Sequence, residues 1–489
     1  MMARMLGRIL FAVPVVAAAA FALLVLIGLW DRYEKDTAVL GFGGVFERLA
    51  WEAGFAGNPN HRTGADAERS LERRTAREQV AAERFYQQVP KLVGTGAPGT
   101  AYQGTSVALS ADGKTAFVGG PGANNADRDR LPLVGPAGAA WVFTRGGSGW
   151  TQQGNKLIGT TNEHGGGLWS QGASVALSAD GNTAIVGGPS DNNTTGAAWV
   201  FSRNGDVWAQ QGKKLVGTGA SGPGEPPLSL GQGMSVALSA DGNTAIVGAW
   251  RAEGAFVFTR RGDVWAQQGK KLVGSGAVGG ARQGMSVALS ADGNTAIVGG
   301  WSDANKTGAA WVFARNGDVW KQQGRKLVGS GAVGNARQGT SVALSADGNT
   351  AIVGGPGDNP SDRFGAGAAG AAWVFTRSEG AWTQQAHKLA ATGGVWTQQG
   401  ASVALSADGN IAAVGGFAHD RNAGAAAVFA RSGGEWTQEK ELAARSGLGK
   451  AAPSVALSAD GSIVLLGEPE DNGGLGAALV FTRSGSGDY

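Results

Sequence analysis

Acidic residues recur at one fixed place along most of this sequence, and carboxylates in a regular pattern could bind metal ions. Seven aspartates each stand directly before a glycine. They are Asp112, Asp180, Asp241, Asp292, Asp347, Asp408 and Asp460. Calcium needs about six to eight oxygen ligands, which come from several carboxylates and carbonyls. One carboxylate in a tight turn cannot supply that shell, so the pattern predicts turn formers, with no bound metal and no cofactor.

Other residue types that carry catalysis are absent or scattered. The chain has no cysteine, which excludes disulfides, thiol catalysis and cysteine-bound metals. The histidines are far apart in the sequence: they are His61, His164, His387 and His419. The sequence contains no Gly-x-Ser-x-Gly motif of a serine hydrolase. We therefore expect a protein that is not an enzyme.

A second group of polar residues lies in connections between apolar segments. These connections are rich in Asp and Asn, whose side chains form turns by bonding to nearby backbone. The same side chains could also make polar contacts with a glycan or a protein. The candidates for ligand contact are Asp191, Asn192, Asn193, Asp303, Asn305, Asp358, Asn359, Asp471 and Asn472. Both interpretations stay open from the sequence.

A repeated unit positions all of these residues. The octapeptide SVALSADG begins at Ser106, Ser174, Ser235, Ser286, Ser341, Ser402 and Ser454. Three further short apolar runs follow it, such as residues 182–188, 196–201 and 208–217 of the second copy. Asp-Gly between the first two runs is a strong hairpin signal. Each unit is thus a four-stranded antiparallel sheet, and radial repetition of such sheets gives an all-β propeller, here with seven blades.

The two ends of the repeat region complement each other. The last unit stops after its third strand, near Arg483, while residues 85–96 form a fourth strand that precedes the first unit, with Phe85 at the usual Trp position. We expect this N-terminal strand to complete the seventh blade and close the ring. Lysine pairs such as Lys213-Lys214 recur on the fourth strand, where charge at a sheet edge discourages aggregation.

Loop lengths divide the two faces of the expected disc. Hairpin 1–2 keeps its length in all seven copies and hairpin 3–4 in the six that contain it. The 2–3 loops run from 4 to 17 residues, and the 4–1 connections also vary. In an antiparallel blade, the 2–3 and 4–1 connections emerge on the same face. A rigid scaffold with one variable loop face is typical of binding modules.

The repeats resemble the FG-GAP family, the propeller type of integrin α chains and many bacterial surface proteins. The second copy has Gln171-Gly172-Ala173-Ser174-Val175-Ala176, then Asp180-Gly181, then Ile185-Val186-Gly187-Gly188-Pro189. The resemblance covers residues 85–483 and implies a seven-bladed fold. Glutamine or another residue replaces the Phe of the family motif, and the acidic Asp-x-Asp-x-Asp-Gly loop of calcium-binding members is missing.

The N-terminal region predicts a membrane anchor. Residues 9–30 carry no charge and are long enough to cross a bilayer as one helix, after a short cytoplasmic tail of residues 1–8. A cleaved signal peptide is the alternative. Residues 31–84 are expected to be a charged, partly helical linker to the propeller at 85–489. Residues 38–53 have an apolar face that could lie on the membrane or pack on protein.

Composition limits the partners of this chain. The 489 residues carry 41 Lys and Arg against 38 Asp and Glu, a net charge of +3, which gives no reason to expect nucleic acid. We therefore predict a single-pass membrane protein whose propeller lies on the periplasmic or cell-surface side. It would bind a protein or glycan through its variable loops. The alternative is a scaffold or assembly factor that docks envelope or membrane-complex proteins.

Overall fold

A computed structural model describes residues 85–97, 99–122, 138–147, 149–160, 170–219, 230–360, 368–392, 396–418, 423–443 and 453–483. The chain divides into two units, residues 1–75 and 76–489, and the described residues all belong to the second. The anchor predicted at 9–30, the linker at 31–84 and the stretch 38–53 lie outside the described residues. Within the described ranges, no helix is long and apolar enough to span a membrane.

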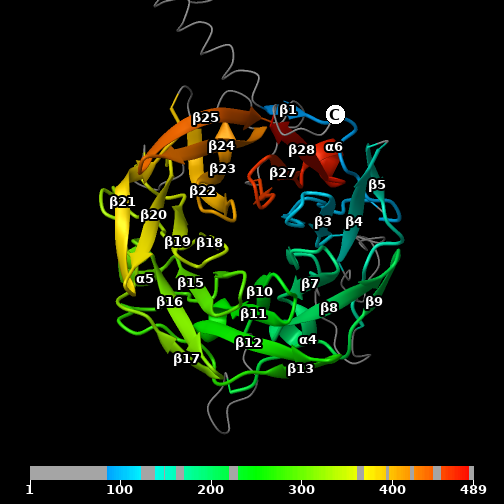
Figure 1. Cartoon of the computed structure of the whole chain (residues 1–489), viewed down its shortest axis with the longest axis horizontal. Helices are drawn as coiled ribbons and strands as arrows, with labels where there is room; N and C mark the ends of the chain where they lie inside the picture. Colours follow the sequence, from blue (N-terminus) through cyan, green and yellow to red (C-terminus); the bar gives the residue numbers. More distant parts are fainter. Residues whose placement is uncertain are drawn as a thin grey trace, which may run out of the picture. The chain divides into compact units, whose positions relative to one another are not determined.

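Seven four-stranded antiparallel sheets follow one another around a ring, as Figure 1 shows. From the inner to the outer strand, the first three blades are β2 (Ser106–Leu109), β3 (Thr115–Gly120), β4 (Ala139–Gly146) and β5 (Gly149–Gln152); β6 (Ser174–Leu177), β7 (Thr183–Gly188), β8 (Ala197–Asn204) and β9 (Val207–Gln210); and β10 (Gln232–Leu238), β11 (Thr244–Ala249), β12 (Gly254–Arg261) and β13 (Val264–Gln267).

The next three blades have the same order. They are β14 (Ser286–Leu289), β15 (Thr295–Gly300), β16 (Ala309–Asn316) and β17 (Val319–Gln322); β18 (Ser341–Leu344), β19 (Thr350–Gly355), β20 (Ala371–Ser378) and β21 (Ala381–Leu389); and β22 (Trp396–Leu405), β23 (Ile411–Ala418), β24 (Ala423–Ser432) and β25 (Glu435–Ala443). Among the described residues, short helical turns occur in four of the 2–3 loops: α4 (Asp191–Thr194), η1 (Trp250–Ala252), α5 (Asp303–Lys306) and α6 (Asp471–Gly474).

The seventh blade joins the two ends of the propeller. It consists of β26 (Val455–Leu457), β27 (Ile463–Glu468), β28 (Ala477–Arg483) and the N-terminal β1 (Phe85–Gln87). Strand β1 pairs antiparallel with β28, with Phe85 opposite Arg483. A further bridge joins Leu92 to Ala478. The seven-bladed fold and its closure by the N-terminal strand are as the sequence predicts.

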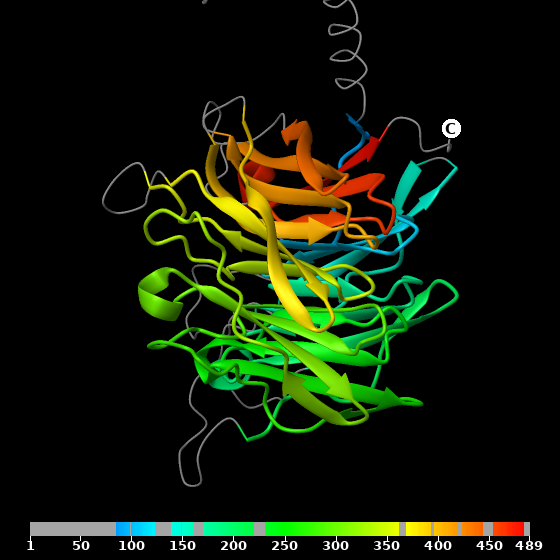
Figure 2. The same ribbon diagram turned by 60° about the vertical axis from the view of Figure 1, so that its left-hand side comes forward.

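Apolar side chains fill the spaces between blades. The third strands of four blades carry fully buried tryptophans, which are Trp141, Trp199, Trp311 and Trp373. Each core cluster draws on two neighbouring blades, and one of them joins Leu465 and Val480 of the seventh blade to Val118 and Trp141 of the first. Figure 2 shows the sheets of neighbouring blades side by side. The alternation of apolar residues along each strand thus serves the contacts between sheets.

Two closed rings of hydrogen bonds run through the octapeptides. The backbone N–H of Ala111 donates to the Ala179 carbonyl of the next blade, and the ring closes where the Ala459 N–H donates to Ala111, both at 2.9 Å. The donors are Ala111, Ala179, Ala240, Ala291, Ala346, Ala407 and Ala459. In the second ring, the first serine of each octapeptide donates to a carbonyl of the next blade, from Ser106 to Gly172 and finally from Ser454 to Gly104. The side-chain bonds give a reason for the repeated first serine, whereas the alanine bonds are made by the backbone.

A polar cluster fastens neighbouring blades at the outer rim. The Gln153 Oε1 atom accepts hydrogen bonds from Trp208 Nε1 at 2.9 Å and from Arg203 Nη1 at 3.3 Å. The Gln153 Nε2 atom donates to Asp206 at 2.7 Å, and the Arg203 guanidinium lies over the Trp208 ring. Similar contacts centre on Gln211 and Gln268. The recurrent Trp, Gln and Arg of the repeats are therefore structural at this rim.

The rim cluster changes where the ring closes. Phe85 stands at the Trp position of the seventh blade and has no N–H to donate. In the sixth blade, Glu439 occupies the position that Gln153 has in the first blade. The Glu439 carboxylate pairs with Arg483 of the seventh blade at 2.6 Å. A charged acceptor thus meets the arginine of the seventh blade, and such charge-assisted hydrogen bonds are stronger than neutral ones.

Candidate functional site

The candidate ligand-contact residues all lie in the 2–3 loops, on the face with variable loop lengths. Asp191, Asp303 and Asp471 begin α4, α5 and α6, and Asp358 occupies the corresponding loop of the fifth blade. All four aspartates are buried, with at most 5% of their surface exposed. A buried carboxylate requires a partner, because losing hydration without compensation is costly.

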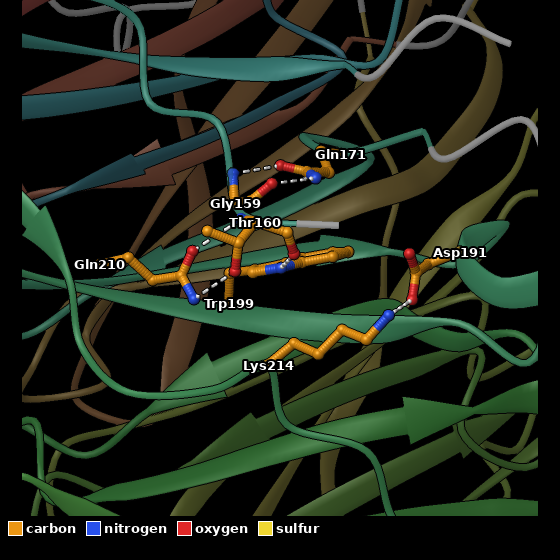
Figure 3. Close-up of polar contacts among 7 residues, drawn as sticks. All are labelled: Gly159, Thr160, Gln171, Asp191, Trp199, Gln210 and Lys214. Carbon is orange, nitrogen blue, oxygen red and sulfur yellow. Dashed lines mark hydrogen bonds and ion pairs between the residues drawn. The ribbon is translucent and has the colours of Figure 1, made fainter. Parts of the chain in front are cut away.

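Each of these aspartates is paired with a lysine of its own blade. Figure 3 shows the Lys214 ammonium on the Asp191 carboxylate, at 2.5 Å. The equivalent pairs are Lys326–Asp303, Lys388–Asp358 and Lys91–Asp471. Asp303 also accepts a bond from the Val278 N–H, and Asp358 from the Val333 N–H, both at 2.7 Å. These ion pairs fix the loops to the scaffold.

The asparagines of the same loops point the other way. Asn192, Asn305, Asn359 and Asn472 are exposed. Their φ angles are 47°, 56°, 52° and 50°, the left-handed conformation that asparagine tolerates better than most residues. Asn193 lies in α4, and its side chain is not described. Ligand contact stays a prediction for the whole set; the four exposed asparagines are the described members whose side chains reach solvent.

The lysine pairs have a role that their sequence positions did not reveal. The second lysine of each pair reaches inward to the 2–3 loop, so the interpretation as edge charge is wrong for it. In the third blade, which has no loop aspartate, Lys271 donates instead to the Ala252 carbonyl at 2.6 Å. Burial lowers the pKa of Lys271, and the nearby Glu253 charge partly opposes this. The spacing of 23 residues shared by Lys214 with Asp191 and by Lys326 with Asp303 was the available signal.

Buried glutamines at the motif position of the family Phe hold the 4–1 connections. The side chain of Gln171 accepts from the Gly159 N–H at 2.6 Å and donates to the Gly159 carbonyl at 3.0 Å (Figure 3). The indole N–H of Trp199 donates to the next carbonyl, of Thr160. A Cβ atom on Gly159 would lie 2.2 Å from the Trp199 ring. The glutamine, the glycine and the tryptophan are thus one structural unit.

The seven repeated aspartates lie on the opposite face, in the 1–2 hairpins. The Asp180 carboxylate accepts bonds from the Ser178 hydroxyl and from the backbone and side chain of Asn182. Burial acts to raise the pKa of Asp180, but these bonds and the Arg203 charge outweigh it and lower the pKa. Its oxygens are thus already used within the hairpin. No group of three acidic, His or Cys residues comes together among the described residues.

We expect the propeller to need no calcium, because the hairpin carboxylates bind their own turns. Adding excess EDTA to the full chain should leave its melting temperature within about 2 °C of the value with millimolar calcium. Thermal melting followed by circular dichroism checks this. A Ser178→Ala variant serves as the comparison, since it removes a bond to Asp180 and should lower the melting temperature with and without EDTA. A large loss of stability on chelation of the unaltered protein would contradict the prediction.

One buried carboxylate on the variable face lacks a hydrogen-bonding partner among the described residues. The Oε1 atom of Glu468, at the end of β27, has none. Five of the other six blades have glycine here, and the third has Ala249. A Cβ on Gly120 or Gly300 would lie 2.8 Å from a tryptophan ring. The seventh blade has Leu479 in place of that tryptophan, which leaves room for a side chain. Burial and the Asp471 carboxylate raise the pKa of Glu468 to about 7, and the Lys91 charge only partly offsets them.

We expect Glu468→Gln to stabilise the protein at alkaline pH. The folded pKa is raised above the unfolded value, so the stability contributed by protonated Glu468 is complete below about pH 4 and is lost as pH rises through 7. The free energy of unfolding of the variant should exceed that of the unaltered protein by roughly 2–3 kcal/mol at pH 8 and match it at pH 4. Denaturant unfolding across this range checks the result. The exposed Glu379→Gln is the control, and a pH-independent difference for Glu468→Gln would refute the titration.

Comparison with known proteins finds likenesses among solved structures alone. No family model and no curated protein sequence matches the chain. Among solved structures, a candidate 6-phosphogluconolactonase from Bacteroides uniformis is 12% identical, with 72% of this chain and 88% of that chain covered and a TM-score of 0.47. Hydrazine synthase of Kuenenia stuttgartiensis is 13% identical, with 82% and 99% covered and a TM-score of 0.47.

A third similar structure is the β-propeller domain of Swd1 from Myceliophteria thermophila. It is 10% identical, with 81% of this chain and 98% of that chain covered and a TM-score of 0.46. The proteins in these structures differ widely in their described activities. None of the three likenesses bears on what this chain binds or catalyses.

Proposed function

We propose that this chain is a non-enzymatic binding module of the FG-GAP type. The carrying observation is the contrast between the two faces of the propeller. Hairpins of constant length on one face are joined by the ring of alanine hydrogen bonds. On the other face the loops vary in length, their aspartates are fixed to the scaffold, and their asparagines are exposed. A rigid base with adaptable loops is the usual construction of a binding site.

The remaining parts of the proposal rest on the sequence. The uncharged residues 9–30 would anchor the chain as a single-pass protein, with the propeller on the periplasmic or cell-surface side. The ligand would be a protein or a glycan. Many titratable groups that could serve catalysis have structural partners instead: Asp191 binds Lys214, and Asp180 binds Ser178. This use of carboxylates favours binding over an enzymatic reaction.

A scaffold that docks envelope or membrane-complex proteins is the second candidate. The observation that favours it is the apolar face within residues 38–53, which could pack on a partner protein. The two candidates differ in the ligand: adhesion requires glycans or foreign surfaces, whereas a scaffold requires proteins of the same envelope.

The test compares asparagines on the two faces in the full chain, purified in detergent. Four substitutions to glycine, Asn192→Gly, Asn305→Gly, Asn359→Gly and Asn472→Gly, remove the exposed side chains while preserving the left-handed backbone. The control is Asn204→Ala with Asn316→Ala, in hairpins 3–4 of the invariant face. Binding is measured to a glycan array and to purified envelope proteins.

We expect the glycine variants to weaken binding at least tenfold, with the control unchanged. Captured glycans would support adhesion, and envelope proteins would support the scaffold. Equal binding by both variants would show that the variable loops do not contact the ligand, and the proposal would then fail.

A further inference from the structure

Departures from the repeat cluster on the variable face of blades three to five. The residue after the second strand is proline in several blades, as in Pro121 and Pro189, but it is tryptophan at Trp250 and Trp301, in adjacent blades. The residue before the buried glutamine is arginine only at Arg282 and Arg337, in the blades that follow these tryptophans. The two kinds of departure therefore occur side by side.

Each of these arginines stacks on the tryptophan of the preceding blade. The guanidinium carbon of Arg282 lies 5.0 Å from the centre of the Trp250 ring, and that of Arg251 lies 4.9 Å from the same ring. Arg337 lies over Trp301 at 5.9 Å. Such cation–π contacts hold a guanidinium in place at partly exposed sites. We call Trp250, Arg251, Arg282, Trp301 and Arg337 the Trp–Arg patch.

The fold does not demand arginine at these positions. Arg282 and Arg337 have φ angles of 59° and 56°, and the third blade has Gly231 at the equivalent place with φ 62°. Glycine adopts this conformation without the steric cost that a side chain adds. Tyr102, Ser170 and Gln398 take the same conformation at the equivalent places of other blades. The backbone conformation is thus common to the blades, and only the arginine side chains are particular to the patch.

The stacked arginines of the patch differ from those of the outer rim in their hydrogen bonds. At the rim, Arg203 donates to Asn182 and to Gln153, and Arg315 donates to Asn294 and to Gln268. On the variable face, no described residue accepts a hydrogen bond from the guanidinium of Arg282 or Arg337. The Nε atom of Arg337 is buried without an acceptor. The rim guanidiniums use their donors within the protein, whereas Arg282 and Arg337 keep donors that have no acceptor among the described residues.

The charges around the patch are mainly positive. Lys306 is exposed, and its backbone carbonyl accepts a bond from the Arg337 N–H at 2.8 Å. The nearby carboxylates are already engaged: Asp303 pairs with Lys326, and Glu253 accepts from the Gln283 N–H at 3.1 Å. Neither carboxylate is hydrogen-bonded to the Arg282 or Arg337 guanidinium, so an anion could bind there.

We propose that the Trp–Arg patch binds a carboxylated polysaccharide, with carboxylate groups seated on Arg282 and Arg337. A planar guanidinium binds a carboxylate through two parallel hydrogen bonds, and stacking on indole fixes its orientation beforehand. The same unit in two adjacent blades suits a polymer with repeated anionic groups. A single-stranded nucleic acid fits less well, because base stacking needs open aromatic faces and two guanidiniums already lie against Trp250.

This inference rests on the proposed binding function and names its ligand class. The test measures binding of the full chain, in detergent, to polygalacturonate, with dextran as the neutral polymer and single-stranded DNA as a competing polyanion. The variant is Arg282→Ala with Arg337→Ala. The control is Lys114→Ala with Arg261→Ala, which removes the same charge from exposed positions of the invariant face. Melting temperatures establish that each protein is folded.

We expect polygalacturonate to bind and dextran not to bind, with affinity falling as salt is added, since screening weakens charge contacts. The double arginine variant should lose at least tenfold in affinity, and the control less than twofold. Equal loss in both would mean nonspecific attraction and overturn the proposal, as would tighter binding of DNA. If polygalacturonate fails but another ligand binds through the exposed asparagines, the carboxylate site is wrong while the binding function stands.

Discussion

Deletion of residues 85–96 from the full chain should unfold or aggregate the propeller. This segment supplies β1, which completes the seventh blade by pairing with β28. It also supplies Phe85 and Leu92, which are 6% and 3% exposed in the core. Burial of two large apolar side chains alone is worth about 3–6 kcal/mol. That is a large part of the stability of a typical protein, before any hydrogen bond is counted.

The deletion also removes contacts on both sides of the closure. Gln88 accepts the indole N–H of Trp150 in the first blade at 2.8 Å. Lys91 neutralises the buried Asp471, and the Gly94 backbone satisfies the buried Gln103. Without the segment, β28 becomes an exposed edge strand, which invites pairing between molecules. We therefore expect loss of the cooperative melting transition or early aggregation.

Thermal melting with light scattering measures both outcomes. The matched control deletes residues 65–76, which is the same number of residues and lies outside the described part of the chain. The control should melt as the unaltered protein does. A normal melting transition for the variant without residues 85–96 would show that the ring does not depend on its N-terminal strand.

Trp199→Ala should cost roughly 3–5 kcal/mol in the free energy of unfolding, the usual range for removing a buried aromatic side chain. Trp199 is fully buried between the first and second blades. The substitution leaves a cavity against Gly159, whose backbone lies against the ring, and it removes the donor to the Thr160 carbonyl. The Gly159 backbone, to which the Gln171 side chain is hydrogen-bonded, would no longer be held by contact with the indole ring.

Trp208→Ala in the same blade is the comparison. This tryptophan is half-buried at the rim and gains from one hydrogen bond to Gln153 and from the Arg203 stack. Its removal should cost roughly 1–2 kcal/mol. Denaturant unfolding of both variants gives the difference. Equal costs would mean that the inner tryptophans do not form the core between blades.

The sequence alone determined the architecture, because its signals are local. Short apolar runs with an Asp-Gly turn specify hairpins through backbone conformation, and seven identical octapeptides specify the number of blades. The match of Phe85 to the Trp position even predicted which strand closes the ring, and β1 pairs with β28 accordingly. The prediction was possible because the same sequence pattern recurs in every blade, so a missing or extra strand can be recognised by alignment with the other copies.

Only the tertiary structure decided what the polar side chains do. Asp191 and Asn192 are adjacent in the sequence, yet one is buried on Lys214 and the other is exposed. Gln153 meets Trp208, and Arg282 meets Trp250, only because neighbouring blades pack together. A side chain's partner depends on the packing of distant segments, whereas the period of a strand depends on adjacent residues. The fold could therefore be predicted from local sequence patterns. Which polar side chains have partners within the protein, and which do not, depends on how the blades pack against one another.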